Sequence, residues 1–210
     1  LVNKAQAKAL NKAGVFSDQD YNKVKECLES LSKEFLTDEQ SLLGDDEDIH
    51  SCIERLVTER IGDLGKKLHT GKSRNDQVIT DVRLFVKETT ANVLDQLEAI
   101  IKAFWEVANQ HKTTIFPGYT HMQPAQPVLL GHHLLAYCEM LERDRSRFSQ
   151  VLIQADVCPL GAAAMAGNNY QLDRDLLASE LGFSQLTANS MDAVSDRDFI
   201  LDFSNETVKS

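Results

Sequence analysis

Residues 75–112, NDQVITDVRLFVKETTANVLDQLEAIIKAFWEVANQHK, carry the strongest structural signal in this chain, because they contain neither glycine nor proline. Their apolar residues recur at three- and four-residue steps, which is the spacing of one face of an α-helix. They are Val78, Val82, Phe85, Val93, Leu97, Ile100, Phe104 and Val107, with Thr89 in the gap. At 1.5 Å per residue the predicted helix is roughly 50 Å long, which calls for a helical bundle or partner subunits.

A second long helix is predicted from about Pro127, since proline suits the first turn of a helix, to about Ala155. Its apolar residues are Leu134, Cys138, Leu141, Phe148 and Leu152, with Arg145 interrupting them.

Shorter helices are expected on both sides of this pair. They cover residues 1–13, 17–35 with Ser17 as the cap, 46–61, 172–181, and a last helix that begins near Asp192 and contains Arg197. We find no convincing pair of strands in the sequence. The predicted fold class is therefore all-α, an elongated helical bundle. We expect an N-terminal helical domain over residues 1–70 and a central long-helix domain over residues 71–210.

The composition is that of an acidic globular protein. Apolar residues make up 42% of the chain, and 32 acidic against 22 basic residues give a formal net charge of −10. This charge argues against a nucleic-acid or anionic-membrane surface, but it leaves room for a small positive pocket. No apolar run is long enough to span a membrane. The chain does not begin with Met, so we expect its N-terminus to be incomplete.

The cysteines point to a reducing compartment. The four cysteines form no C-x-x-C pair and are widely spaced; they are Cys27, Cys52, Cys138 and Cys158. We interpret them as buried thiols of a cytoplasmic protein.

Residues 68–77, LHTGKSRNDQ, place a turn glycine, cations, hydroxyls and an amide directly before the first long helix. Backbone N–H groups at a helix N-terminus lack intrahelical partners and carry partial positive charge. Arg74 can add a bidentate fork, so the run is suited to binding a carboxylate. A polar loop with a helix cap is the alternative interpretation.

Two histidines lie in polar clusters at helix boundaries. His50 follows the acidic run of residues 46–48, whose acids favour the helix dipole without needing a histidine. His121 lies in PGYTHMQPAQP, residues 117–127, a loop constrained by glycine and prolines between the two long helices. It is flanked by Thr120 and Gln123. A neutral imidazole can accept or relay a proton near neutral pH, so His121 is a candidate for acid–base chemistry.

The C-terminal third holds one further cluster. Its small residues, PLGAAAMAGN at 159–168, favour tight helix packing. The nearby acids Asp192, Asp196 and Asp198 either orient Arg197 toward a ligand or neutralise it, and the sequence leaves both interpretations open. His132 and His133 are adjacent and point to different helix faces, so no metal site is expected.

Together these clusters resemble the argininosuccinate lyase and delta-crystallin family, within the fumarase/aspartase superfamily. The matching stretches are DEDIH (46–50), KLHTGKSRNDQ (67–77), GYTHMQ (118–123) with AQP (125–127), PLG (159–161), AG (166–167), NSMD (189–192) and SDRD (195–198). The resemblance covers nearly all of residues 1–203.

The resemblance implies reversible cleavage of argininosuccinate to arginine and fumarate, without a cofactor. It also implies a homotetramer whose long helices form a central bundle, with active sites shared between subunits. It places Ser73, Arg74 and Asn75 at the substrate, and it gives Asn75 and Thr120 contacts to carboxylate or nearby polar groups. His121 takes the base side of the reaction, with His50, Asp48 and Gln123 at the site. Arg197 matches an arginine linked to site geometry.

The chain departs from the family in one major respect: it has no match to the mobile loop GSSxMPxKxN, which supplies a serine favoured as catalytic acid or base. We therefore expect that a C-terminal half is missing and that the 210-residue chain is inactive by itself. Lys72 also stands where arginine is commoner, so it keeps the charge but not the bidentate fork.

Two alternatives stay open. One is a non-catalytic structural protein of the delta-crystallin kind, or an inactive truncated scaffold. The other is a related lyase that acts on another succinyl-type substrate.

Overall fold

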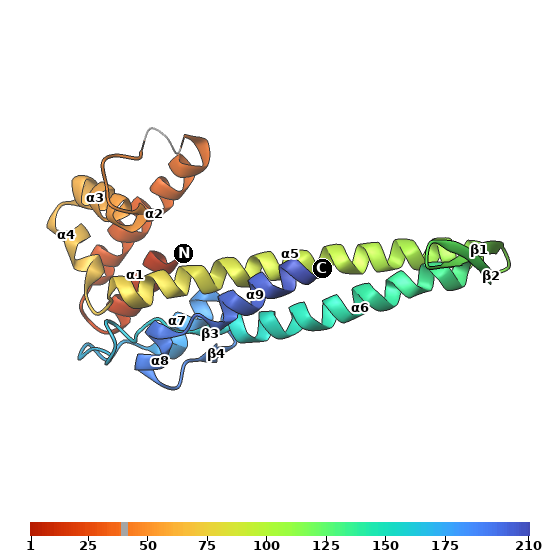
Figure 1. Cartoon of the computed structure of the whole chain (residues 1–210). Helices are drawn as coiled ribbons and strands as arrows, with labels where there is room; N and C mark the ends of the chain where they lie inside the picture. Colours follow the sequence, from red (N-terminus) through yellow and green to blue (C-terminus); the bar gives the residue numbers. More distant parts are fainter. Residues whose placement is uncertain (39–41) are drawn as a thin grey trace. The chain divides into compact units, whose positions relative to one another are not determined.

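The computed structural model describes residues 1–38 and 42–210, and most of these residues lie in α-helices (Figure 1). The helices are α1 (Val2–Lys12), α2 (Asp18–Thr37), α3 (Ile49–Ile61), α4 (Asp63–Lys66), the 3-10 helix η1 (Lys67–His69), α5 (Arg74–Gln110), α6 (Leu130–Ala155), α7 (Arg174–Leu181), α8 (Ser190–Ser195) and α9 (Asp198–Lys209). The predicted all-α fold class is confirmed. No helix in the described part of the chain combines the length and the apolar character needed to cross a membrane.

The chain divides into two compact units. Unit 1 holds Leu1–Arg83 and Val157–Asp196, and unit 2 holds Leu84–Asp156 and Arg197–Ser210. Helix α5 runs through the division, so that its first turns belong to unit 1 and its later turns to unit 2. The boundaries of these units differ from those of the expected domains 1–70 and 71–210. The division of the whole protein into those two domains stays a prediction.

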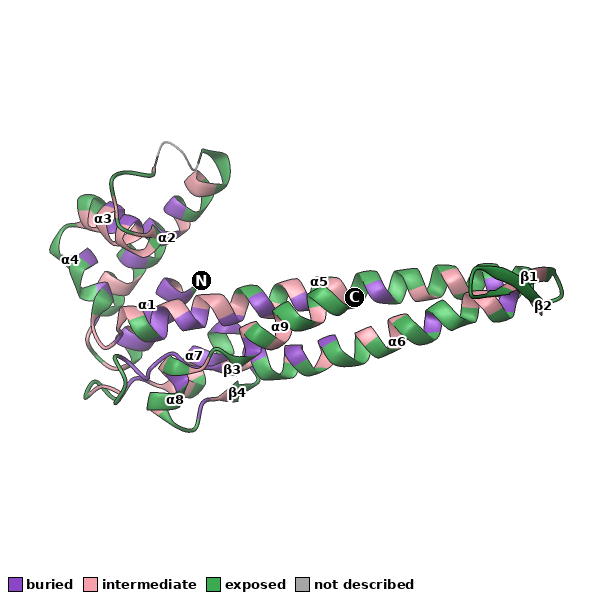
Figure 2. Cartoon of the chain, viewed as in Figure 1, coloured by how far each residue is buried: buried purple, intermediate pink, exposed green. Residues whose placement is uncertain are grey.

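Helix α1 lies at the centre of unit 1, where it contacts α2, α7 and η1. Its small side chains Ala5, Ala7 and Ala9 are buried, and Figure 2 shows α1 largely in the colour of buried residues. Small residues let the neighbouring helices approach closely, because little side-chain volume separates the backbones. The two-residue strands β3 (Val157–Cys158) and β4 (Gln185–Leu186) pair in parallel beside α7.

Helices α5 and α6 lie side by side in unit 2. The rings of Phe104 and Tyr137 stack with centroids 5.7 Å apart, and the thiol of Cys138 donates a weak hydrogen bond to the carbonyl oxygen of Ile101. At Gly131 an added Cβ would lie 2.7 Å from the carbonyl oxygen of Ala108, so only glycine permits this close approach of the two helices. Helix α9 packs on α6 through Phe148 and Phe203.

Several predicted helix ends are confirmed. Ser17 forms a capping box with Asp20 at the start of α2. Gly14 and Gly182 adopt left-handed backbone angles, with φ of 74° and 73°, just beyond α1 and α7. Helix α5 starts one residue before and ends two residues before the predicted limits 75 and 112.

The prediction that no strands pair was wrong. β1 (Ile115–Thr120) and β2 (Gln123–Leu129) form an antiparallel hairpin with Ile115 opposite Leu129. The prolines concealed it, because proline cannot donate to a ladder; an exposed two-stranded hairpin tolerates them at positions whose N–H is not needed. Since residues 123–129 pair as a strand, α6 starts at Leu130 and not near Pro127.

Three further expectations about helices need correction. Helix α3 starts at Ile49 and not at residue 46, because Asp48 caps it from outside. The predicted helix from Asp192 through Arg197 is two helices, since α8 ends at Ser195 and Arg197 precedes α9. The predicted apolar stripe of α5 is buried only in part, because α6 covers one side of the helix; Phe85, Ile100 and Val107 are exposed.

Candidate active site

Ser73 and Asp76 cap the start of α5 in unit 1. The backbone N–H of Asn75 donates to the Ser73 hydroxyl at 3.3 Å, and the backbone N–H of Ser73 donates to Oδ1 of Asp76 at 2.8 Å. The helix-cap interpretation of residues 68–77 is thus confirmed. The cap engages neither the guanidinium of Arg74 nor the side-chain amide of Asn75, so it does not compete with a ligand for these groups.

Arg74 has several polar neighbours, which lie on α3, at the N-cap of α3 and on α5 itself. Its Nη1 and Nε atoms lie 3.3 Å from Glu54 Oε1 and 3.4 Å from Asp48 Oδ2. Its guanidinium also donates to Ser51 and Gln77, at 3.2 and 3.1 Å. All these distances are longer than is typical of charge-assisted hydrogen bonds, so an incoming carboxylate could take over part of the fork.

The N-terminus of α3 places Asp48 and His50 in the same unit. Asp48 Oδ1 accepts from the backbone N–H of Ser51 at 2.7 Å, and this bond lowers the pKa of the Asp48 carboxyl. Burial lowers the pKa of His50 below 6.5, against the opposing charge of Asp81, whose Oδ2 lies 3.7 Å from His50 Nδ1. The lowered pKa favours the neutral imidazole, which is the form that can accept a proton.

Lys72 is buried behind the turn and does not point at solvent. Its ammonium donates to Oδ1 of Asn3 on α1 at 2.6 Å, and burial lowers its pKa to about 8. Gln6 of α1 is also buried and donates to the carbonyl oxygen of Thr70 at 2.7 Å. The polar side of α1 therefore supports the turn from within unit 1.

The loop of residues 159–168 packs on the same turn. The side-chain amide of Asn75 donates to the carbonyl oxygen of Ala164 at 3.0 Å, and that of Asn168 donates to the carbonyl oxygen of Gly71 at 2.9 Å. Asn75 and Ala164 are both exposed. The small residues of this loop thus do more than pack a helix, which was the interpretation favoured from the sequence.

Thr120, His121 and Gln123 lie at the tip of the hairpin in unit 2. Thr120 ends β1 and pairs with Gln123, the first residue of β2. His121 and Met122 form the loop between them with φ of 52° and 59°, as a type I′ turn requires of its two central residues. This left-handed conformation costs about 1–2 kcal/mol for each residue other than glycine. All four residues of the tip are exposed, so the hairpin presents His121 outward from its strands.

A bulge near Gly118 shapes this tip. The pairing register shifts between Pro117 and Tyr119, and a Cβ added at Gly118 would lie 2.6 Å from the carbonyl oxygen of Gln126. Glycine is therefore required at the bulge, which increases the local twist and re-aims the residues beyond it.

Arg197 is the N-cap residue of α9 in unit 2 and is exposed. One of its three neighbouring acids, Asp196, forms an ion pair with Arg83 in unit 1. The two interpretations of Arg197, as a ligand-directed or a neutralised side chain, both stay open.

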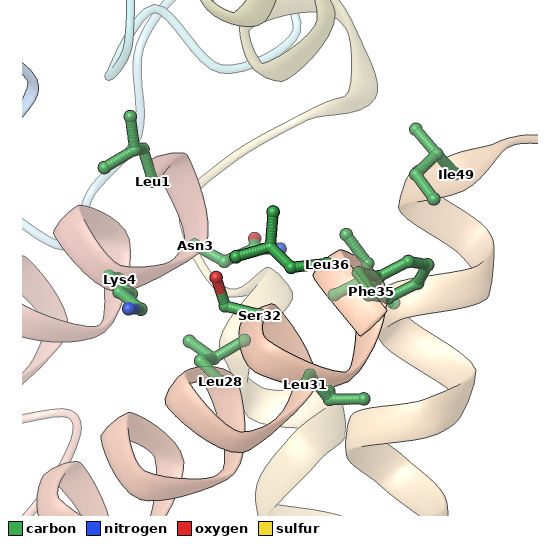
Figure 3. A pocket seen from close by; sticks show the side chains of 10 residues that line it. Leu1, Asn3, Lys4, Leu28, Leu31, Ser32, Phe35, Leu36 and Ile49 are labelled. Atoms are coloured by element: carbon green, nitrogen blue, oxygen red, sulfur yellow. The ribbon is translucent and has the colours of Figure 1, made fainter. Parts of the chain in front are cut away.

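A cavity of about 490 Å³ lies elsewhere in unit 1, between α1, α2 and α3. Figure 3 shows its mainly apolar lining, which includes Leu28 and Leu31 from α2 and Ile49 from α3. Ser73, Arg74 and Asn75 are not among its lining residues. The candidate site is therefore the polar cluster at the start of α5, which lies outside this cavity.

The structure thus gathers the sequence-predicted site residues into two groups. Asp48, His50, Ser73, Arg74 and Asn75 lie in unit 1, where α3 and the first turn of α5 meet through the contacts of Arg74. The residues in unit 2 are Thr120, His121, Gln123 and Arg197.

Sequence reasoning missed two parts of the site's support. One is the buried pair Asn3 and Gln6 on α1, for which no motif was a signal. The other is Asp76, which accepts hydrogen bonds from backbone N–H groups of the loop 159–168. Its place three residues after Ser73 could have indicated a helix cap, but not a partner 85 residues later in the sequence.

Comparisons with known proteins identify similar sequences and a shared fold. A protein family described as "Lyase" matches residues 2–208. A protein of Thermoanaerobacter sp. (strain X514) named argininosuccinate lyase is 48% identical over 199 residues, which cover 95% of this chain and 44% of that protein. The argininosuccinate lyase of Prochlorococcus marinus (strain MIT 9301) is also 48% identical, over 95% of this chain and 43% of its own. The chain therefore spans less than half the length of these relatives.

Solved structures share the fold over almost the whole chain. A variant of EDDS lyase with bound fumarate matches with a TM-score of 0.90 and 27% identity, covering 99% of this chain and 41% of its own. A structure from Brucella melitensis described as fumarate lyase:delta crystallin matches with a TM-score of 0.81 and 23% identity, over 99% of this chain and 52% of its own. The second likeness concerns the fold alone.

Proposed function

Because the chain belongs to the lyase family, we propose that the protein is an argininosuccinate lyase, which cleaves argininosuccinate reversibly to arginine and fumarate. The observation that carries the proposal is the 48% identity to argininosuccinate lyases over 95% of the chain. In this β-elimination a base takes the proton from the carbon beside a carboxylate. The C–N bond then breaks, its electron pair stays on nitrogen, and a proton donor neutralises the leaving guanidino group.

The polar turn before α5 supplies groups that suit a dicarboxylate. Loss of the carbon-bound proton builds negative charge on the adjacent carboxylate, and donors that bind this charge more tightly as it develops lower the barrier. We assign Arg74, Asn75 and Ser73 to this role. Arg74 can offer a fork, the amide of Asn75 is exposed, and the helix N-terminus adds partial positive charge. The fumarate bound in the related EDDS lyase variant supports a dicarboxylate ligand.

We assign His121 to the base side of the reaction, with Thr120 and Gln123 as its polar neighbours at the hairpin tip. Its presentation supports this assignment, because a strained two-residue turn at an exposed tip holds the imidazole away from its own strands. His50 is a second candidate for proton transfer, since burial lowers its pKa and Asp81 lies beside it. We place Asp48 at the substrate and assign Arg197 to site geometry.

We also propose a homotetramer with active sites shared between subunits. Large apolar side chains are exposed on the two long helices in unit 2: Ile100 (45%), Trp105 (57%), Leu135 (42%), Met140 (48%) and Ile153 (54%). Large apolar side chains that are left exposed in one chain are suited to burial at an interface between proteins. Further copies of the same helices are suitable partners, because they bring matching apolar side chains.

We place the protein in the cytoplasm. The four cysteines are free and buried, which fits a reducing compartment.

The proposal is tested by adding argininosuccinate to the full-length protein and following the ultraviolet absorbance of fumarate. We expect steady turnover without any added cofactor. A correctly assembled full-length protein that releases no fumarate would favour a non-catalytic role of the delta-crystallin kind. Turnover of a different N-substituted succinate in a substrate panel, with argininosuccinate unchanged, would assign a related lyase activity instead.

A further inference from the structure

The carboxylate of Asp76 joins two segments of unit 1 that are far apart in the sequence. Its Oδ1 accepts from the backbone N–H of Ser73 at 2.8 Å. Its Oδ2 accepts from the backbone N–H groups of Gly161 and Ala163, at 3.1 and 2.8 Å. Asp76 is completely buried, so these three bonds form where water does not compete for them. They tie the loop of residues 161–164 to the first turn of α5.

The loop needs such a tie because its backbone is strained. Gly161 has φ of 99°, and Ala163 has φ of 52° although it carries a side chain. A residue other than glycine keeps a left-handed conformation only where contacts with its surroundings hold it there. The hydrogen bond from the Ala163 N–H to Asp76 helps to hold this residue, together with its burial.

Ala164, the next residue of the loop, links the contact between Asp76 and Ala163 to the candidate site. The carbonyl oxygen of Ala164 accepts from the side-chain amide of Asn75, and both residues are exposed. The direction of the Asn75 amide therefore depends on where the loop places Ala164. That placement depends in turn on the bond between Ala163 and Asp76.

We propose that Asp76 is a positioning residue, which acts through residues 161–164 on the amide of Asn75 and thereby sets how tightly the site holds a dicarboxylate. The inference rests on the proposed function, which assigns Asn75 to a substrate carboxylate. Asp76 itself is buried and touches no substrate.

The substitution Asp76→Asn isolates this role. Asparagine has nearly the same shape, but it offers one acceptor oxygen in place of two and adds an NH₂ donor. In the wild type, three backbone N–H groups donate to the two carboxylate oxygens of Asp76. In the variant an NH₂ group replaces one of these oxygens, so it must face either the N–H of Ser73 or the N–H groups of the loop. One of the two segments therefore loses its tie, while the buried volume hardly changes.

The experiment uses the full-length protein with Asp76→Asn and, as a matched control, Ser17→Ala. The control removes the cap of α2 and destabilises unit 1 without touching the loop. Titration calorimetry with fumarate measures the Kd. Hydrogen exchange followed by mass spectrometry measures the protection of the peptides that cover residues 70–77 and 160–165. The release of fumarate from argininosuccinate is measured on the same samples.

For Asp76→Asn we expect a rise of about 10-fold or more in the Kd for fumarate, because small misplacements of a binding group are costly. We also expect faster exchange in one of the two peptides. For Ser17→Ala we expect the wild-type Kd. An unchanged Kd or unchanged exchange in Asp76→Asn overturns the positioning role, as does a rise of equal size in Ser17→Ala. If the wild-type protein neither binds fumarate nor releases it, the proposed function fails and the positioning role fails with it.

Discussion

The side-chain amide of Asn75 donates a hydrogen bond to the carbonyl oxygen of Ala164, 3.0 Å away and 89 residues later in the sequence. This bond uses one N–H of the amide and leaves its other N–H and its oxygen to an incoming group. The exposed position of Asn75 at the start of α5 makes those atoms accessible. The contact thus fixes the amide without consuming it.

Replacing Asn75 by alanine removes this oriented donor. We expect kcat/KM for argininosuccinate to fall about 100- to 1,000-fold, the range found when one donor to a developing oxyanion is removed. The rate of fumarate release measures the effect. Asn92→Ala is the matched control, since Asn92 is an exposed amide further along the same helix. We expect this variant to keep wild-type turnover. Normal turnover in Asn75→Ala would contradict the assignment of Asn75 to the substrate.

His121→Asn keeps a polar side chain at the hairpin tip and removes the titratable ring. We expect kcat to fall about 100- to 10,000-fold, because a positioned acid–base group contributes a factor of this size. His132→Asn is the control, as His132 is an exposed histidine in the first turn of α6. Equal rates in the two variants would remove His121 from the mechanism.

Gly118→Ala tests whether the bulge orients the hairpin tip. The new Cβ would lie 2.6 Å from the carbonyl oxygen of Gln126, so the two strands must separate or shift their register. We expect a loss of lyase activity with helix content unchanged by circular dichroism. At Gly14 an added Cβ meets nothing within 4 Å, so Gly14→Ala costs only the left-handed strain of about 1–2 kcal/mol and leaves the rate unchanged. A fully active Gly118→Ala enzyme would show that the bulge is dispensable.

Lys72 makes stability depend on pH in a predictable direction. Burial lowers its pKa from 10.5 to about 8, so the folded chain sheds this proton more easily than the unfolded chain. Burial of the charged lysine therefore lowers the free energy of unfolding by about 3 kcal/mol below pH 8. This destabilisation disappears as the pH rises to 10.5.

The pH dependence is measured by urea unfolding of the wild type and Lys72→Met across the window from pH 8 to 10.5. Methionine cannot titrate, so the difference between the two proteins isolates Lys72. We expect the free energy of unfolding of the wild type to rise relative to the variant by at most about 1.4 kcal/mol per pH unit. A constant difference, or one that falls with pH, would contradict the lowered pKa.

Ile100→Asp tests the proposed assembly through the exposed face of α5. Ile100 is 45% exposed, so the substitution costs little within one chain, but a buried charge at a subunit interface is strongly unfavourable. We expect a tetramer for the wild type and smaller species for the variant, as measured by light scattering after gel filtration. Gln96→Glu adds the same charge at an exposed polar position of α5, and we expect it to keep the tetramer. A tetrameric Ile100→Asp protein would exclude Ile100 from the interface.

The long helix α5 was predictable because its signal is local. Residues 75–112 lack helix breakers and repeat their apolar residues at helical spacing, and the structure has the helix from Arg74 to Gln110. Its buried face was not predictable in the same way: Leu97 is buried while Phe85 is exposed, since burial depends on which neighbour covers each side. The hairpin of residues 115–129 was missed because prolines conceal strand pairing in a sequence pattern.

The candidate site shows the same division between local and distant information. In each of the runs 46–50, 68–77 and 117–127, the polar side chains that indicate the chemistry lie within a few adjacent residues. The family resemblance follows from the order of these runs. Only the structure reveals that Lys72 is buried against Asn3, which lies 69 positions earlier in the sequence. A buried lysine and an exposed lysine look alike in a sequence, because burial is a property of what packs around the side chain.

The sequence by itself determined the helical character of the chain, because helix periodicity and capping act over a few neighbouring residues. Its short polar motifs likewise indicated the family. The tertiary structure alone decided that Asp76 holds Gly161 and Ala163, and that Ala164 in turn holds Asn75. Such a contact joins segments with no shared local pattern. It forms only when burial removes water and leaves each backbone N–H group to find a partner within the protein.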